Sequence, residues 1–314
     1  MRAALYDRYG GPGVLYEGTV PAPVPQAGEV LVRVHATSVN GGEPTVRAGK
    51  LRAVAGRGFP KRTGVDFAGE VAALGNGVSR FTIGDRVWGV LGRTFGTAAE
   101  YVAVSADRPA LAPAGLDLVR AAALPAAGTT ALTALRDKAR LGSGERLLVR
   151  GGAGGVGSIA VQLGRAYGAH VTALAGAKHL DFVRELGADE ALDYSTTAPE
   201  DLGRFDVVLD TVGTRFADFR RLLSPTGRMV AITFDSARLL RSVGTLLAAA
   251  VFDRRVHAFS GNPRHDLLAD LTRLTEAGDI EPVVDRTYPL AEIAEAHRAF
   301  EAGGIRGKLV VTVA

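Results

Sequence analysis

Three glycines with the spacing of a dinucleotide-binding turn are the residues whose chemistry is easiest to infer. Gly152, Gly154 and Gly157 stand in G-x-G-x-x-G register between an apolar run (147–150) and a helix-forming stretch (158–167). In a dinucleotide site the first glycine makes the tight turn, the second lets the backbone approach a pyrophosphate, and the third lets helix and strand pack closely. The helix N-terminus presents free N–H groups and a positive dipole end to the phosphates. The pattern predicts dinucleotide binding, with a purely structural glycine turn as the alternative.

The residues after the second expected strand (170–175) favour NADP(H) over NAD(H). An NAD site usually carries an Asp or Glu about 20 residues beyond the glycines, which binds the ribose 2′-hydroxyl. Here small residues (175–177) end that strand, and the first acid, Asp181, lies inside the next expected helix. Lys178 offers a point charge to a 2′-phosphate. A cation in the first turn of a helix is unfavourable against the helix dipole, which favours a phosphate-binding lysine over a solvated one.

Composition limits the class of protein. The chain has 314 residues, of which 47% are hydrophobic and 22% charged, which suits a globular protein of about two domains. Cysteine is absent, which excludes disulfides, thiolate zinc sites, iron–sulfur clusters and thiol catalysis and fits a cytoplasmic protein. The net charge of +4 is scattered over the chain, so nucleic-acid binding is not expected. The longest apolar run (243–252) is too short for a membrane span, and the N-terminus has no signal-peptide layout.

The apolar pattern changes near residue 121. Before it, short alternating stretches between turns predict a small rolled or barrel-like antiparallel domain, as at 30–36, 69–74 and 85–90. After it, apolar strands alternate with helices, the later strands being 171–174, 205–210 and 228–232. Such alternation indicates a parallel, doubly wound sheet covered on both faces. Two more helices (267–277 and 293–300) precede a last strand (308–313).

With these segments in place, the chain resembles the zinc-independent quinone oxidoreductase branch of the medium-chain dehydrogenase/reductases. The segments that carry the resemblance are 38–40, 64–71, 84–87, 99–102, 124–131, 144–162, 292–297 and 307–310. The resemblance implies an α/β fold in which a Rossmann doubly wound parallel sheet is inserted in a GroES-like β-rich catalytic domain. The catalytic domain would comprise residues 1–121 and 263–314, and the NADP(H)-binding Rossmann domain residues 122–262.

The resemblance also implies which residues would hold the cofactor. Those near the nicotinamide ribose, its phosphates and the pyrophosphate would be Thr130, Gly154, Gly155 and Val156. Lys178 and Tyr194 would flank the adenosine 2′-phosphate, although Tyr194 could also be an ordinary tyrosine at a strand end. Phe234 and Phe259, which follow two later strands, would line the nicotinamide.

In the substrate region, the resemblance places Asn40 opposite the substrate carbonyl. Its amide could donate to an oxygen that gains charge during hydride transfer, and a turn residue before two glycines is the alternative. Zinc-using relatives bind zinc through a Cys near Asn40 and a His where this chain has Asp66. One carboxylate without a soft ligand does not make a zinc site, so no metal is expected. We expect Asp66 to be structural and paired with an Arg or Lys, with proton transfer as the alternative.

The expected function is hydride transfer from NADPH to a quinone or an α,β-unsaturated carbonyl. No dedicated proton donor is evident, and a conjugated acceptor suits this because hydride addition gives a delocalised anion that water can protonate. Thr45 stands where many members of the branch have a tyrosine, which leaves the quinone preference open. The alternatives are a 2-enoyl thioester reductase and a non-catalytic NADPH-binding or sensing protein. Because relatives are commonly dimers or tetramers, a homodimer is expected. The apolar segment 238–252 would lie near such an interface, with ordinary core as the equal alternative.

Overall fold

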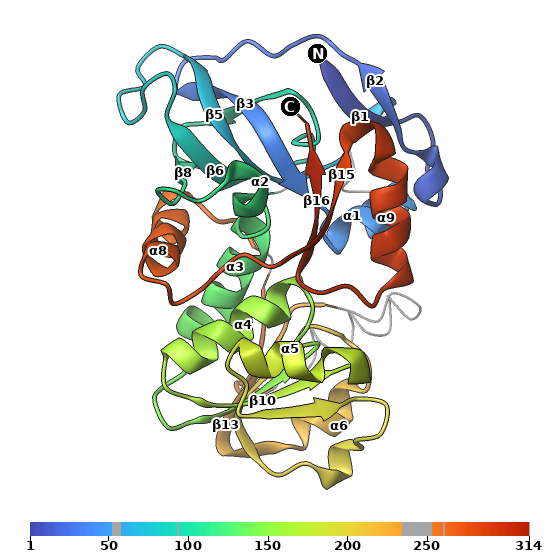
Figure 1. The fold of residues 1–314 in the computed structure, drawn as a ribbon, viewed down its shortest axis with the longest axis vertical. Helices are drawn as coiled ribbons and strands as arrows, with labels where there is room; N and C mark the ends of the chain where they lie inside the picture. The colour runs from blue at the N-terminus through green and yellow to red at the C-terminus, as the bar shows by residue number, and fades with distance from the viewer. Residues whose placement is uncertain (52–57, 93, 234–252, 260, 314) are drawn as a thin grey trace. The chain divides into compact units, whose positions relative to one another are not determined.

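The computed structural model describes residues 1–51, 58–92, 94–233, 253–259 and 261–313. They form two compact units, which Figure 1 shows in colours that follow the chain. The first unit comprises Met1–Thr129, Asn262–Gly278 and Pro282–Ala314, and the second Thr130–Gly261 and Asp279–Glu281. The predicted α/β fold, a β-rich GroES-like part with an inserted parallel sheet, is confirmed. Helix α3 (Pro125–Leu132) carries the chain from the first unit into the second.

The first unit is built on a seven-stranded sheet that the C-terminal strand helps to complete. The strand order is β15-β16-β3-β5-β6-β8, with β7 also paired to β3, and a separate sheet has the order β2-β1-β4. The strands are β1 (Arg2–Tyr6), β2 (Tyr16–Thr19), β3 (Glu29–Ser38), β4 (Lys61–Arg62), β5 (Asp66–Leu74), β6 (Arg86–Val90), β7 (Tyr101–Ser105), β8 (Ala110–Leu111), β15 (Val284–Pro289) and β16 (Lys308–Thr312). The helices are α1 (Gly42–Arg47), α2 (Leu118–Ala121), α8 (His265–Glu276) and α9 (Ile293–Ala302).

Alternation along β3 explains why this sheet forms a core. Val30, Val32 and Val34 are buried on one face of the strand and pack in one apolar cluster with Leu309 and other strand residues. Such period-two burial is what an antiparallel sheet with one packed face requires. Strand β16 pairs antiparallel with the end of β3, so that Val310 lies opposite Ser38. This pairing brings the C-terminal segment to the residues that follow β3.

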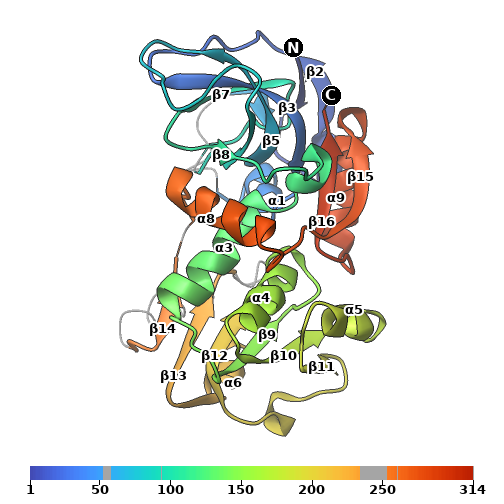
Figure 2. The same ribbon diagram turned by 60° about the vertical axis from the view of Figure 1, so that its left-hand side comes forward.

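The second unit contains a six-stranded sheet in which every neighbouring pair is parallel. Figure 2 shows its order, β11-β10-β9-β12-β13-β14. The strands are β9 (Arg146–Arg150), β10 (His170–Ala175), β11 (Glu190–Asp193), β12 (Phe205–Asp210), β13 (Leu223–Ala231) and β14 (Val256–Ala258). The helices are α4 (Gly155–Ala166), α5 (Leu180–Glu185) and α6 (Phe216–Arg220). The strand order reverses between β9 and β12, which is the place where doubly wound sheets bind ligands.

Several expected elements have slightly different bounds. Strands β10 and β12 match their predicted ranges, but β13 begins at Leu223 and is longer than the expected 228–232. Helix α4 begins at Gly155 because Gly154 is its N-cap. Three predicted features lie outside the described residues: Phe234, the segment 238–252 of the homodimer argument, and the run 243–252 of the membrane argument. Within the described ranges, no helix is long and apolar enough to cross a membrane.

Candidate functional site

The glycine turn after β9 contains glycines that are required for different reasons. Gly151 has φ of +77°, so the left-handed residue of this turn is the glycine that directly precedes the G-x-G-x-x-G register. A β-carbon at Gly152 would lie 2.9 Å from the β-carbon of Ala173 on β10, and one at Gly157 would lie 2.0 Å from the carbonyl oxygen of Gly151. Gly152 and Gly157 therefore allow the turn to pack against β10 and against α4.

Gly154 is not explained by packing or by backbone conformation. It is the N-cap of α4 with φ −77° and ψ 177°, an extended conformation that any residue can adopt. A β-carbon there would meet nothing closer than the oxygen of Gly151, at 3.5 Å. The missing side chain leaves space beside the first residues of α4, Gly155 and Val156. Because a helix N-terminus attracts phosphate, this space fits the close approach of a pyrophosphate.

Lys178 and Tyr194 follow neighbouring parallel strands. Ala175 at the end of β10 pairs with Asp193 at the end of β11, so the residues after both strands reach the same edge of the sheet. Tyr194 is 67% exposed, and a β-carbon at Gly176 would lie 3.5 Å from its Cε1 atom. Lys178 is exposed in a 3₁₀ turn (Ala177–His179). An exposed planar ring and a cation therefore stand at one edge, as an adenosine 2′-phosphate would require.

Of the remaining predicted cofactor residues, the structure describes Thr130 and Phe259. Thr130 is half-buried on α3, at the start of the second unit. Phe259 is half-buried directly after β14, at the carboxyl end of a parallel strand. Phe234 lies outside the described residues. The contacts of these three residues with a nicotinamide stay predictions.

Sequence reasoning gave no role to Arg150 and Asp210, which form a buried ion pair at the ends of β9 and β12. The guanidinium lies 2.8 Å from the Asp210 carboxylate and 3.6 Å from the ring centre of Phe219. Burial lowers the pKa of Arg150, and the charge of Asp210 opposes that effect. Asp210 also accepts bonds from the backbone N–H groups of Val212 and Gly213. The available signal was that two adjacent parallel strands end on opposite charges.

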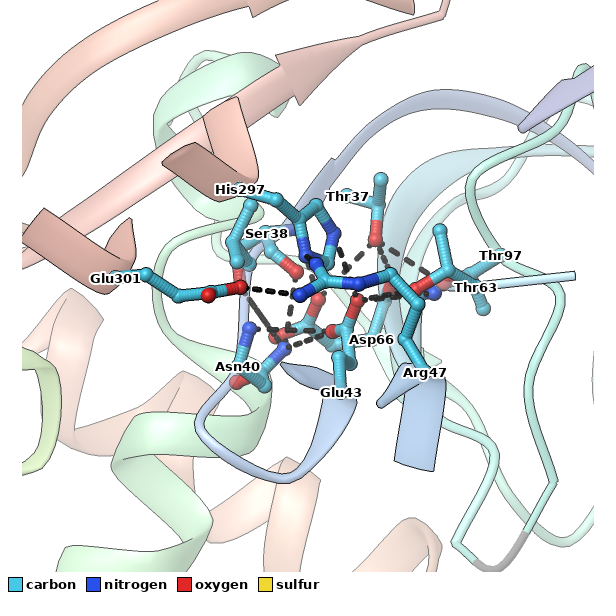
Figure 3. Close-up of polar contacts among 12 residues, drawn as sticks. Thr37, Ser38, Asn40, Glu43, Arg47, Thr63, Asp66, Thr97, His297 and Glu301 are labelled. Atoms are coloured by element: carbon cyan, nitrogen blue, oxygen red, sulfur yellow. Dashed lines mark hydrogen bonds and ion pairs between the residues drawn. The ribbon is translucent and has the colours of Figure 1, made fainter. Parts of the chain in front are cut away.

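In the first unit, Asn40 lies in a group of polar side chains that we call the Asn40 cluster, composed of Ser38, Asn40, Glu43, Asp66 and Lys308. Lys308 Nζ donates to Asn40 Oδ1 at 2.6 Å. Because an ammonium only donates, this bond fixes which end of the amide is oxygen. Asn40 Nδ2 then donates to the Ser38 carbonyl at 2.9 Å and to Asp66 at 3.1 Å (Figure 3). Longer contacts run to Glu43, at 3.3 Å, and to the Ser38 hydroxyl, at 3.4 Å.

Asp66 is fully buried, and its hydrogen bonds come from neutral groups. Its carboxylate accepts from the Ser38 hydroxyl at 2.5 Å, from the Ser38 N–H at 2.8 Å and from Asn40. Burial raises the pKa of Asp66, while the positive charge of Lys308 and the bonds from Ser38 act against that rise. The cation that we expected beside Asp66 is therefore Lys308, which acts through its charge. Ser38 and Asn40 supply the hydrogen bonds.

Glu43 is buried on α1 and anchors the segment around Asn40. Its carboxylate accepts from the Thr63 hydroxyl at 2.6 Å and from the Asn40 backbone N–H at 3.1 Å. Burial acts to raise the pKa of Glu43, but hydrogen bonds from His297 and Thr63 and the charge of Lys308 outweigh it and hold that pKa below its usual range. His297 Nδ1 lies 3.0 Å from Arg47, which can only donate. A neutral His297 therefore carries its proton on Nε2, 3.5 Å from Glu43.

The Asn40 cluster does not have the composition of a metal site. Its only carboxylates are Glu43 and Asp66, and its cation, Lys308, lies among them. Within the part of the chain that the structure describes, no group of three His, Cys, Asp or Glu side chains could hold a metal ion. The cluster instead offers amide and hydroxyl donors and a balanced set of buried charges. Sequence reasoning gave Lys308 no role, although this lysine opens an apolar C-terminal strand and lies in a segment (307–310) that carries the family resemblance.

Two stretches of the chain match known protein families. Residues 26–114 match the family model described as alcohol dehydrogenase GroES-like domain, and residues 186–311 match the one described as zinc-binding dehydrogenase. The chain is 33% identical to the chloroplast envelope quinone oxidoreductase homolog of Arabidopsis thaliana, over 99% of this chain and 98% of that protein. The chain belongs to the quinone oxidoreductase branch of the medium-chain dehydrogenase/reductase superfamily.

Two further relatives of this quinone oxidoreductase-like enzyme are similar over most of its length. It is 34% identical to the chloroplastic NADPH-dependent alkenal/one oxidoreductase of Arabidopsis thaliana, over 99% of this chain and 79% of that protein. The solved quinone oxidoreductase from Coxiella burnetii superposes with a TM-score of 0.91 at 31% identity, covering 100% of this chain and 99% of that one. Membership of a family of enzymes sets aside the non-catalytic alternative. The cytoplasmic location stays a prediction, since two of these relatives are named as chloroplast proteins.

Proposed function

We propose that this enzyme, an NAD(P)H-dependent oxidoreductase by family, uses NADPH to reduce a quinone or an α,β-unsaturated carbonyl. The observation that carries the choice of NADPH is the edge formed by Lys178 and Tyr194. A cation and an exposed ring would hold the 2′-phosphate and the adenosine. A ribose 2′-hydroxyl would instead call for a carboxylate after β10, and small residues stand there. A relative named as an NADPH-dependent alkenal/one oxidoreductase supports the same choice.

The residues around the glycine turn would bind and orient the cofactor. The open space at Gly154 would admit the pyrophosphate, and the N–H groups of Gly155 and Val156 at the start of α4 would face it. The Arg150–Asp210 pair ties the ends of β9 and β12 together beside this turn. Bound NADPH would supply the hydride, so the task of the chain is to place it and to stabilise charge.

The Asn40 cluster would serve the acceptor. Asn40 Oδ1 is occupied by Lys308, so the amide can only offer N–H groups to a ligand. That matches a carbonyl or quinone oxygen, which becomes negatively charged as hydride is added. Nδ2 carries two N–H groups, and its shorter bonds run to the Ser38 carbonyl and to Asp66. A substrate oxygen would share one of these N–H groups and take the place of the longer contacts to Glu43 and the Ser38 hydroxyl. The resulting enolate or hydroquinone anion is delocalised and takes its proton from water.

The test is NADPH oxidation under nitrogen against a panel of benzoquinone, phenanthrenequinone, short enones and crotonyl-CoA, with NADH as the control. We expect faster turnover with NADPH than with NADH, and turnover of quinones or enones. Turnover of crotonyl-CoA alone would replace the proposed substrate class with 2-enoyl thioesters. Equal rates with NADH would contradict the role of Lys178.

A further inference from the structure

Lys308 is a buried lysine that the proposed function has so far used only as the partner of Asn40. It opens β16, and only 6% of its surface is exposed. Nζ donates to the Asn40 side-chain oxygen at 2.6 Å and to the Val39 carbonyl at 2.8 Å. We propose that Lys308 is a positioning residue for the reduction, which orients the Asn40 amide and supplies the positive charge that lets this amide receive a developing oxyanion. The inference rests on the proposed function, because it requires Asn40 to face the acceptor.

Lys308 contacts the oxygen of the Asn40 amide, and the Ser38 carbonyl and the Asp66 carboxylate contact its nitrogen. All three contacts require the same orientation of the amide. The ammonium has no lone pair to offer, and the Ser38 carbonyl has no proton. A rotated amide would place its N–H groups against the ammonium and its oxygen against the Ser38 carbonyl and the Asp66 carboxylate. A charge-assisted bond at Oδ1 also polarises the amide and strengthens its N–H groups as donors. Lys308 therefore acts on the far end of the group that meets the substrate.

The charges around Asn40 explain why a cation is needed there. Two buried carboxylates, Asp66 and Glu43, lie within 3.3 Å of the Asn40 amide nitrogen. A substrate oxygen that gains negative charge beside this amide would be repelled by both carboxylates. Lys308 lies on the oxygen side of the same amide, and its charge acts on both carboxylates. Arg47, the other buried cation near the cluster, bonds His297 and Glu301 instead.

A double-mutant cycle separates positioning from general stability. The variants are Lys308→Met, Asn40→Ala and the two combined, with Lys138→Met, an exposed lysine of the second unit, as the matched control. We expect Lys308→Met and Asn40→Ala each to lower kcat about 10- to 100-fold, the effect of losing a hydrogen bond to a charged group. The dissociation constant of NADPH should stay unchanged, and the control should keep the wild-type kcat. Because Lys308 acts through Asn40, the double variant should be no slower than Asn40→Ala alone.

A charge-balanced variant covers the case in which Lys308→Met unfolds. Lys308→Met combined with Asp66→Asn removes one charge of each sign, so thermal stability should recover towards the wild type while kcat stays low. Recovery of kcat together with stability would overturn the proposal, and so would multiplicative losses in the double variant. Wild-type kcat in Asn40→Ala would overturn it as well. A wild-type enzyme that oxidises no NADPH with any acceptor would refute the proposed function itself, and this inference with it.

Discussion

Alanine at Gly154 and alanine at Gly157 should separate ligand binding from folding in the glycine turn. A β-carbon at Gly157 would lie 2.0 Å from the Gly151 oxygen and 2.9 Å from the Gly152 Cα. Ordinary van der Waals contact begins at 3.4 Å, so the overlap with the oxygen is 1.4 Å (3.4 minus 2.0). The atoms it meets belong to the backbone and cannot rotate away, so α4 must move relative to the turn.

The two substitutions therefore have different expected magnitudes. For Gly157→Ala we expect a loss of about 3 kcal/mol in the free energy of unfolding, the upper part of the overpacking range, and a lower Tm by about 10 °C. Gly154 has an extended backbone and a nearest contact of 3.5 Å, so Gly154→Ala should change stability by less than about 1 kcal/mol. Its β-carbon would fill the proposed pyrophosphate space and weaken NADPH binding about tenfold or more, about 1.4 kcal/mol.

Thermal unfolding without nucleotide and fluorescence titration with NADPH measure the two effects separately. Gly11→Ala is the matched control, because Gly11 is also a helix N-cap with extended backbone and nothing lies within 4 Å of its β-carbon position. It should change neither quantity. Wild-type NADPH affinity in Gly154→Ala would refute the account of the open space, and a large loss of stability there would show that Gly154 is a packing residue.

Three further predictions concern charges. Lys178→Glu should weaken NADPH binding at least about tenfold and leave NADH binding unchanged, and a titration that shows unchanged NADPH affinity would contradict the 2′-phosphate role. Arg150→Met leaves the buried Asp210 carboxylate without its partner and should lower the free energy of unfolding in urea by about 3–5 kcal/mol. Arg150→Met combined with Asp210→Asn should recover most of that loss. Equal losses in both variants would contradict the ion pair. Because the pKa of Glu43 is lower in the folded state than in the unfolded state, its stabilisation is complete above the unfolded pKa and is lost as pH falls below about 4. Glu43→Gln should therefore be less stable at pH 7 and lose less stability between about pH 5 and pH 3 than the wild type, and parallel curves would contradict this.

The parallel sheet could be predicted from the sequence because its pattern is local. Strands that are buried on both faces read as continuous apolar runs, and glycines and helices bound them, so β10 and β12 have their predicted ends. The register assigned the tight turn to Gly152, and it did not show that the preceding Gly151 takes the positive φ. Two adjacent glycines are equally able to adopt that conformation, so only the packing of Gly152 on β10 distinguishes them.

The candidate substrate site was only partly predictable, because its contacts join distant parts of the chain. Asn40 was found through its local segment, but Lys308 is 268 residues away and reaches it through the pairing of β16 with β3. The register of that pairing depends on tertiary packing. The Arg150–Asp210 pair likewise depends on the register between β9 and β12. A sequence shows such charges singly and does not show which of them meet.

The central claim is that this enzyme moves hydride from NADPH to a conjugated acceptor, and isotope transfer tests it most directly. NADPH that carries deuterium in both positions at C4 is incubated with the enzyme and a short enone, and the product is analysed by mass spectrometry and NMR. The account predicts one deuterium in the product, on the β-carbon, and a proton from water on the α-carbon. Consumption of NADPH without deuterium in the product, or deuterium that enters only from labelled water, would contradict it.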